Sequence, residues 1–295
     1  MTQPRKRHAA PYLFLAPYLI FLAVFGVAPA VYAVWVSFET PEAAFAGLAN
    51  WTAVLADARL LPSVRNVGTY LGLWLPTMLV LVTGLSLLAH QRGGRLSAAS
   101  RFAWYLPGAV TGAAAALLWL FMLSPGISPF SPLLRLAGVS SGTDLLSGQG
   151  LPVVLTVMAT TVTAGGWIVV VYAALNTVPP EILEAARVDG ATAWQVTRYI
   201  KLRHIRPQLS LMLISSFAYG TQIFVEPQVL RSAFTSQVSE TWSVNQLAYF
   251  FATQRGNFGM AASLSLMLLG VGLLVAAIVI AKTDLYATGA RKGAR

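Results

Sequence analysis

The feature that most restricts the fold of this chain is a set of six long apolar runs. A helix needs about 20 mostly apolar residues to cross a bilayer, and each run reaches that length. Lys, Arg, Asp and Glu make up only 10% of the 295 residues, against roughly 25% in an ordinary soluble domain. The sequence therefore predicts an all-α integral membrane protein with six transmembrane helices, at residues 11–38, 67–90, 102–123, 151–175, 208–230 and 258–281.

The distribution of Lys and Arg predicts how these helices are oriented. Fifteen of the 20 basic residues lie in the two terminal tails and in the loops 91–101 and 176–207, and the other five lie in the loops between. Loops rich in Lys and Arg stay in the cytoplasm. We therefore expect cytoplasmic tails at 1–10 and 282–295 around a spanning domain at 11–281. The net charge of +10 is then an orientation signal, and we expect no nucleic-acid partner.

The sequence contains no recognisable machinery for chemical catalysis. It has no cysteine and only three histidines, so a thiolate metal site and a cysteine nucleophile are excluded. No GxxxxGK[ST] phosphate-binding loop and no cluster of His or acidic residues with metal-ligand spacing occurs. We expect no cofactor, no metal and no catalytic residue, and we expect the chain not to be an enzyme.

One charged segment, EILEAARVDGATAWQVTRYI at 181–200, interrupts the apolar pattern. Pro179 and Pro180 precede it, and proline suits the first turn of a helix. Gly190 follows an aspartate where a left-handed residue would end that helix. A second short helix fits 192–201, and Pro207 would end it.

Small side chains gather on this predicted helix–turn–helix, at Ala185, Ala186 and Ala191. Small residues let another surface approach closely, which indicates a docking element. A basic amphipathic connector that lies on the membrane surface fits the same charges. The residues alone leave both interpretations open.

The segment strongly resembles the EAA loop of the permease subunits of ABC importers, the binding-protein-dependent transport inner membrane component family. The family pattern runs E-A-A-x-x-D-G-A, then about nine residues, then I-x-L-P and a further proline. The sequence departs from it at Arg203, where the family usually has proline. The matching residues are Glu184, Ala185, Ala186, Asp189, Gly190, Ala191, Trp194, Ile200, Leu202 and Pro207.

Other segments resemble the sugar-permease branch of this family, in particular the upstream permease of maltose and glycerol-3-phosphate type systems. FAGLANW at 45–51 is similar to a segment that follows the first span of that branch. EPQVL at 226–230 and NFGMAASLSLMLL at 257–269 are similar to its last outside loop and its sixth span.

The resemblance implies a type I ABC importer permease in the bacterial cytoplasmic membrane, crossing it several times and in contact with lipid. With a second permease subunit, such a chain forms the path for a sugar or sugar derivative. An extracellular or periplasmic solute-binding protein delivers the cargo, and a separate ATPase dimer drives transport from the cytoplasmic side. The EAA loop, 179–207 here, couples the ATPase dimer to the transport path. The resemblance therefore implies coupling roles for Glu184, Ala185, Ala186, Asp189, Gly190 and Ala191.

Four polar residues are candidates for the cargo path: Tyr219, Gln222, Glu226 and Asn245. An ionisable residue at membrane depth is a functional candidate, although Glu226 could instead pair with Arg231. Amide and aromatic side chains suit sugars, but they also suit contacts between helices.

Two other classes of function compete with an ABC permease. An ion-coupled secondary transporter of a small polar solute usually has interrupted helices with buried ionisable groups. The predicted spans contain almost no central acid or base, which argues against ion coupling. An integral membrane enzyme would need a constellation of His, Asp or Glu residues, which the sequence lacks.

Overall fold

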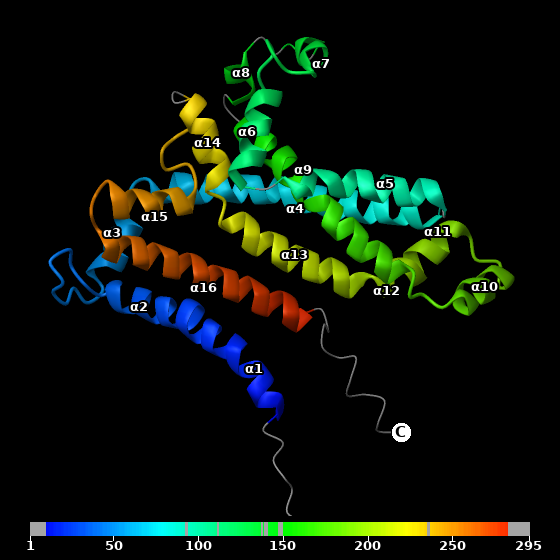
Figure 1. Cartoon of the computed structure of the whole chain (residues 1–295), viewed down its shortest axis with the longest axis horizontal. Helices are drawn as coiled ribbons and strands as arrows, with labels where there is room; N and C mark the ends of the chain where they lie inside the picture. Colours follow the sequence, from blue (N-terminus) through cyan, green and yellow to red (C-terminus); the bar gives the residue numbers. More distant parts are fainter. Residues whose placement is uncertain are drawn as a thin grey trace, which may run out of the picture. The chain divides into compact units, whose positions relative to one another are not determined.

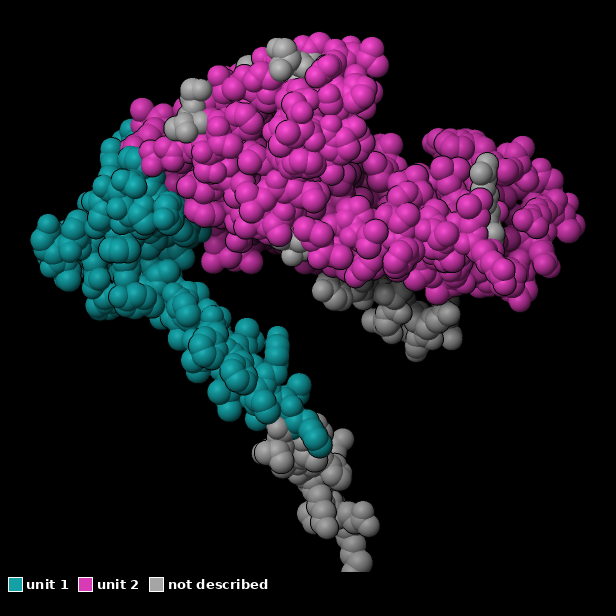
Figure 2. Space-filling model, turned by 45° about the horizontal axis from the view of Figure 1, so that its top comes forward, with its two compact units in different colours: residues 1–57, 248–267 teal, residues 58–247, 268–295 magenta. Residues whose placement is uncertain are grey.

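A computed structural model describes residues 10–91, 94–110, 112–136, 138, 141–146, 150–234 and 237–282, with side chains from residue 14 onward. Over these residues the structure consists of helices and turns, with one isolated β-bridge between Glu39 and Phe45 (Figure 1). The chain divides into two compact units, Met1–Asp57 with Ala248–Met267, and Ala58–Leu247 with Leu268–Arg295 (Figure 2). We call them unit 1 and unit 2.

Unit 1 begins with a long apolar helix that contains a π-helical segment. The helices of this part of the chain are α1 (Ala10–Phe21), η1 (Leu22–Val27), α2 (Ala28–Val36) and α3 (Ala49–Ala56). No residue of η1 or α2 is buried, and large apolar side chains such as Phe25 and Trp35 are about 70% exposed. A helix that is apolar on all sides and exposed in its own chain needs lipid or another subunit around it.

The FAGLANW segment is held in unit 1 by one buried amide. The Asn50 side chain donates hydrogen bonds to the carbonyl oxygens of Ser37, at 3.0 Å, and Glu39, at 2.7 Å. Asn50 is only 6% exposed, so these bonds form where water does not compete. They fix the turn between α2 and α3.

Unit 2 contains most of the remaining helices. They are α4 (Leu60–Gln91), α5 (Arg95–Tyr105), η2 (Leu106–Ala109), α6 (Gly112–Met122), α7 (Ser131–Leu136), α8 (Gly142–Leu146), α9 (Gly150–Leu175), α10 (Pro180–Val188), α11 (Ala193–Gln195), η3 (Val196–Lys201), α12 (Leu202–His204), α13 (Arg206–Thr221) and α14 (Val225–Ala233). Two further helices, α15 (Val244–Thr253) and α16 (Phe258–Lys282), belong partly to each unit.

The core of unit 2 lies between α4 and α9. Residues every four positions along α4 are fully buried, from Tyr70 and Trp74 to Met78 and Val82, which places them on one face of the helix. Hydroxyls tie the two helices together, because Ser86 donates to the Ile168 carbonyl at 3.2 Å. Lipid tails are as apolar as leucine, so packing and hydrogen bonds of this kind hold membrane helices together.

The helices match the predicted spans only in part. Four helices are long and apolar enough to cross a membrane unbroken: Phe14–Val36, Leu60–Gln91, Gly150–Leu175 and Phe258–Lys282. The runs predicted at 102–123 and 208–230 are each two helices joined at a bend. The described residues therefore contain four candidate spans, or up to six if each bent pair counts as one.

Two of the six predicted spans are bent. Arg95–Ala109 and Gly112–Met122 meet at 104°, across a break that includes residue 111, which lies outside the described residues. Pro107 and Gly108 fall in the 3₁₀ segment η2 just before this break. Arg206–Thr221 and Val225–Ala233 meet at 43°. The tails predicted at 1–10 and 282–295 lie outside the described residues apart from Ala10 and Lys282.

Candidate coupling surface and cargo pocket

The first helix of the charged segment forms and stops where the sequence predicts. Helix α10 begins at Pro180, with Glu181 in its first turn, where a carboxylate meets the positive end of the helix dipole. At its end the N–H of Ala191 bonds the Ala186 carbonyl at 2.9 Å, and the N–H of Gly190 bonds the Arg187 carbonyl at 3.1 Å. This is a Schellman motif, and Gly190 has the positive φ, 79°, that it requires.

The second helix extends beyond the predicted range of 192–201, and Pro207 does not end it. Thr192 caps α11 through a capping box with Gln195, a T-x-x-Q pattern that satisfies free backbone N–H groups. The helix continues through η3 and α12 to His204. Pro207 lies in the first turn of α13, where its missing N–H costs no hydrogen bond. The proline therefore begins the next helix instead of ending the previous one.

The coupling surface, defined here as α10 together with the turn 189–192, is open. No residue of α10 is buried. Glu184, Ala185, Asp189 and Gly190 are exposed, and Ala186 and Ala191 are half-buried. The apolar side chains of Ile182, Val188 and Trp194 are 49%, 88% and 66% exposed. A hollow of about 310 Å³ opens beside the turn, lined by Asp189, Gly190, Ala191, Gln195, Val196, Tyr199 and Ile200.

Polar contacts fasten this segment to the ends of the long helices. His204 Nε2 lies 2.8 Å from the Thr177 hydroxyl, just after α9. His90 Nδ1, at the end of α4, lies 3.2 Å from Asn176 Oδ1. These contacts join α12 to the residues that follow α9, and those residues to the end of α4.

Lys201, at the end of η3, is packed into unit 2. It is only 9% exposed, and burial followed by the positive charge of Arg187 lowers the pKa of its ammonium group. Burial disfavours the charged form of a lysine, so this position is held by packing in spite of its charge. The contrast with the open α10 is confined to this end of η3, because Arg198 and Tyr199 earlier in η3 are exposed.

The second candidate site lies at the bend between α13 and α14. A pocket of about 490 Å³ opens there, within unit 2. Tyr219, Gln222 and Glu226, three of the four cargo-path candidates, line it together. The other lining residues, which the sequence analysis did not select, are Gly112, Ala218, Ile223, Phe224 and Val225.

Asn245, the fourth candidate, has a different position. It is not among the lining residues, and its side-chain amide donates a hydrogen bond to the Gln222 carbonyl at 3.0 Å. Residues at a helix end have carbonyls without intrahelical partners. Asn245 supplies that partner and so holds the bend beside the pocket.

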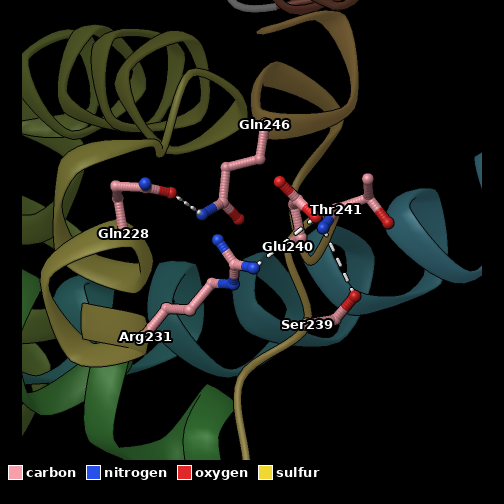
Figure 3. Close-up of polar contacts among 6 residues, drawn as sticks. All are labelled: Gln228, Arg231, Ser239, Glu240, Thr241 and Gln246. Atoms are coloured by element: carbon pink, nitrogen blue, oxygen red, sulfur yellow. Dashed lines mark hydrogen bonds and ion pairs between the residues drawn. The ribbon is translucent and has the colours of Figure 1, made fainter. Parts of the chain in front are cut away.

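Glu226 does not form the ion pair with Arg231 that the sequence left open as an alternative. Arg231 instead pairs with Glu240, at 3.5 Å between Nη2 and Oε2 (Figure 3). Glu226 lies in the first turn of α14 and is half-buried at the pocket.

A second polar contact in Figure 3 ties α14 to α15. Gln246, which is 1% exposed, donates from Nε2 to Gln228 Oε1 at 3.1 Å. Gln246 also forms a reciprocal cap with Ser243, at 3.1 Å in each direction. Gln246 was not among the candidates selected from the sequence, although S-x-x-Q before the apolar run LAYFF is the pattern of a capping box.

The loop before α15 is also fixed to α4. The Ser63 hydroxyl donates to the Thr241 carbonyl at 2.5 Å, and the Asn66 amide donates to the Trp242 carbonyl at 3.1 Å.

In Figure 1, α13 runs through unit 2 from α14 to α12. A single helix therefore links the pocket to the coupling segment.

The sequence profile of the binding-protein-dependent transport system inner membrane component family matches residues 68–281. The chain belongs to this family. Named permease proteins of transport systems align with most of this chain. The sn-glycerol-3-phosphate transport system permease protein UgpA of Brucella suis biovar 1 (strain 1330) is 33% identical over 239 residues, 75% of each chain. The arabinooligosaccharides transport system permease protein AraP of Halalkalibacterium halodurans is 26% identical over 291 residues, 97% of this chain and 90% of AraP.

Solved structures share the fold. A chain of a bacterial ABC transporter involved in the import of the acidic polysaccharide alginate superposes with a TM-score of 0.76 at 20% identity. The match covers 94% of this chain and 96% of that one. A bacterial alginate ABC transporter in complex with an alginate pentasaccharide-bound periplasmic protein also matches, with a TM-score of 0.76 at 19% identity.

Family membership decides between the classes of function that the sequence left open. The chain is a permease subunit of an ABC importer and a multi-pass membrane protein. The ion-coupled secondary transporter is the alternative that these comparisons do not support. The family is one of transport permease subunits and not of catalytic enzymes.

Proposed function

We propose that this chain is one of two permease subunits that form the path of a sugar importer in the bacterial cytoplasmic membrane. The named relatives act on glycerol-3-phosphate and arabinooligosaccharides, which supports a sugar or sugar derivative as cargo. The alginate transporter was solved with its periplasmic binding protein, which supports delivery of cargo by an extracellular or periplasmic solute-binding protein.

The observation that carries the proposal is the open coupling surface. Helix α10 is exposed, contains the adjacent alanines Ala185 and Ala186, stops at Gly190 and borders a hollow. These features fit a surface that another protein covers. We assign that protein as the ATPase dimer. Glu184 is its polar anchor, Ala185, Ala186 and Ala191 allow close packing, and Asp189 and Gly190 set the turn. Movement of the ATPase would shift α10 and, through α12 and α13, the bend beside the pocket, a rigid-body transition.

The second permease subunit would cover apolar helices that this chain leaves exposed. The stretch Phe14–Val36 has no buried residue in its most apolar window. Exposed apolar faces in a membrane protein contact lipid or another subunit, and close helix contacts need complementary packing. We expect part of this stretch to face the second permease and the rest to face lipid.

We further propose six spans with both termini in the cytoplasm, and each bent pair counted as one span. Residues 1–10 and 282–295 are then cytoplasmic tails, 11–281 is the spanning domain, and 179–207 is the cytoplasmic coupling loop. The charge count, fifteen basic residues against five, supports this orientation.

Reporter fusions test this topology. An enzyme that is active only outside the cytoplasm should give signal when it is fused after Gly142, and none after Gly94 or Gly190. The same fusions made to a cytoplasm-active reporter should give the reverse pattern. Strong external activity at Gly190 would place the coupling loop outside and would overturn both the topology and the ATPase assignment.

We assign the pocket at the α13–α14 bend to the cargo path. Tyr219 and Gln222 supply hydroxyl and amide groups, and Glu226 supplies a carboxylate, which together suit the hydroxyl groups of a sugar. Asn245 acts as a positioning residue, because it holds the Gln222 carbonyl.

Reconstitution of the assembled transporter tests the function as a whole. The chain would be purified with its second permease and its ATPase and placed in lipid nanodiscs. ATP hydrolysis would be measured with a panel of solute-binding proteins, each loaded with a sugar or left empty. One loaded binding protein should stimulate hydrolysis above its empty form. A chain that forms no complex with an ATPase, or that transports solute on an ion gradient alone, would contradict the proposal.

A further inference from the structure

The pocket at the α13–α14 bend has an unbalanced charge. Its lining residues include one carboxylate, Glu226, and none of them is Lys, Arg or His. The remaining polar side chains, Tyr219 and Gln222, are neutral hydrogen-bonding groups. The others are glycine, aliphatic residues and Phe224.

The nearest basic residue along α14 does not correct this imbalance. Arg231 lies five residues after Glu226, on the same helix, and its guanidinium is engaged by Glu240 at 3.5 Å. Figure 3 shows the Arg231 side chain directed toward the loop that contains Glu240. Its charge is therefore already compensated outside the pocket.

The chemistry of the lining distinguishes neutral from anionic cargo. A carboxylate accepts short, strong hydrogen bonds from hydroxyl groups, and an aromatic ring offers an apolar surface to the C–H faces of a sugar. A phosphate or carboxylate group on the cargo would instead bring a like charge beside Glu226, and like charges at close range repel. Sites that take phosphate or carboxylate groups commonly present Arg or Lys to them, and the lining of this pocket contains neither.

We propose that this pocket takes an uncharged, hydroxyl-rich sugar and that Glu226 excludes phosphorylated and acidic sugars. This inference rests on the proposed function, because it assumes that the pocket lies on the cargo path. It separates this chain from the relative named for glycerol-3-phosphate and from the alginate transporter, whose cargoes are anions.

The absence of cysteine from the whole chain allows a direct test of the charge in the pocket. Gln222→Cys places a single thiol in the lining, and it leaves the backbone carbonyl that Asn245 binds. The probes are two thiol reagents of similar size, a cationic and an anionic methanethiosulfonate. They are applied to the assembled transporter at low ionic strength, and labelling of this chain is followed by intact mass.

With Glu226 present, the cationic reagent should react with the Gln222→Cys variant faster than the anionic one by about tenfold or more, after correction for their rates with a free thiol. Glu226→Gln should bring this ratio close to one, and Glu226→Asp should preserve it. The control is Ala99→Cys, an exposed position on α5 outside the coupling surface, where Glu226→Gln should leave the ratio unchanged. An anionic reagent that labels the Gln222→Cys variant as fast as the cationic one would overturn the inference.

The identity of the cargo gives a second, independent test. In the reconstituted transporter, the binding protein that stimulates ATP hydrolysis should be loaded with an uncharged sugar. Stimulation by a binding protein loaded with glycerol-3-phosphate or an oligouronate would support the importer function and overturn the exclusion of anions. A failure of every binding protein to stimulate would count against the proposed function, while the thiol ratios would still report the charge of the pocket.

Discussion

Uptake of cargo is expected to be abolished by Ala185→Trp, while the chain still inserts into the membrane. Ala185 is exposed on α10 beside the glycine stop. A tryptophan there would hold a docking surface away from the helix backbone, and overfilling a packed contact is destabilising. Glu184→Lys should have the same effect, because it reverses the charge of the proposed anchor. Neither substitution changes an apolar span, so insertion should not suffer.

The measurement is cargo uptake together with co-purification of the ATPase, at matched membrane levels. Ala99→Trp serves as the control, because it makes the same change at an exposed alanine on α5, outside the coupling surface. If α10 were only a connector on the membrane surface, Glu184→Lys would be harmless or favourable beside anionic lipid. Normal uptake with both variants would reject the coupling role of α10.

A second large effect is expected from a single methyl group in the core of unit 2. Gly165 of α9 lies against the backbone of Trp104 and Tyr105. The Cβ of an alanine at this position would overlap the Trp104 carbonyl and the Tyr105 Cα atom, and neither is a flexible side-chain end. We expect Gly165→Ala to destabilise the protein by about 3 kcal/mol, at the upper end of the usual cost of overpacking.

The adjacent residue provides a matched control for this prediction. A Cβ at Gly166 would meet no atom within 4 Å, and alanine favours a helix over glycine. Gly166→Ala should therefore keep the thermal midpoint of the detergent-solubilised protein, whereas Gly165→Ala should lower it and reduce the yield of monodisperse protein. Equal midpoints for the two variants would show that α5 and α9 do not approach as closely as described.

The sequence predicts elements well where the signal is local. The long runs of α4, α9 and α16 follow from apolar length, because a membrane helix must satisfy its own backbone within the segment. The stop of α10 follows from a single glycine whose positive φ ends the helix. These signals depend on neighbouring residues only, so no knowledge of the tertiary structure is needed to use them.

The bends are not predictable in this way. Hydropathy averages over about 20 residues, so it merges α13 and α14 into one run. The carbonyl of Gln222 at the bend is satisfied by Asn245, 23 residues further along. A break that depends on such a distant partner leaves no local signal. Pro107 and Gly108 were a local hint of the other break, but proline also occurs in unbroken membrane helices.

The two candidate sites differ in the same way, because one is defined by contiguous residues and the other depends partly on residues that are distant in the sequence. The loop that resembles the EAA motif was recognisable because its residues are contiguous and their spacing is specific. For the pocket, residue chemistry selected Tyr219, Gln222 and Glu226, which do lie together. It could not separate them from Asn245, which supports the bend from another helix. Whether these side chains meet cargo stays a prediction.

The openness of α10 has a consequence for the cell that produces this protein. Val188 on α10 and Trp194 on α11 are exposed, and exposed apolar side chains that cluster mark an interaction surface. We therefore expect this chain to be short-lived when it is made without the ATPase proposed to cover α10, because chaperones and proteases continuously triage incomplete chains. The turnover of the subunit would then set the stoichiometry of the transporter, so that surplus copies are removed and complete complexes remain.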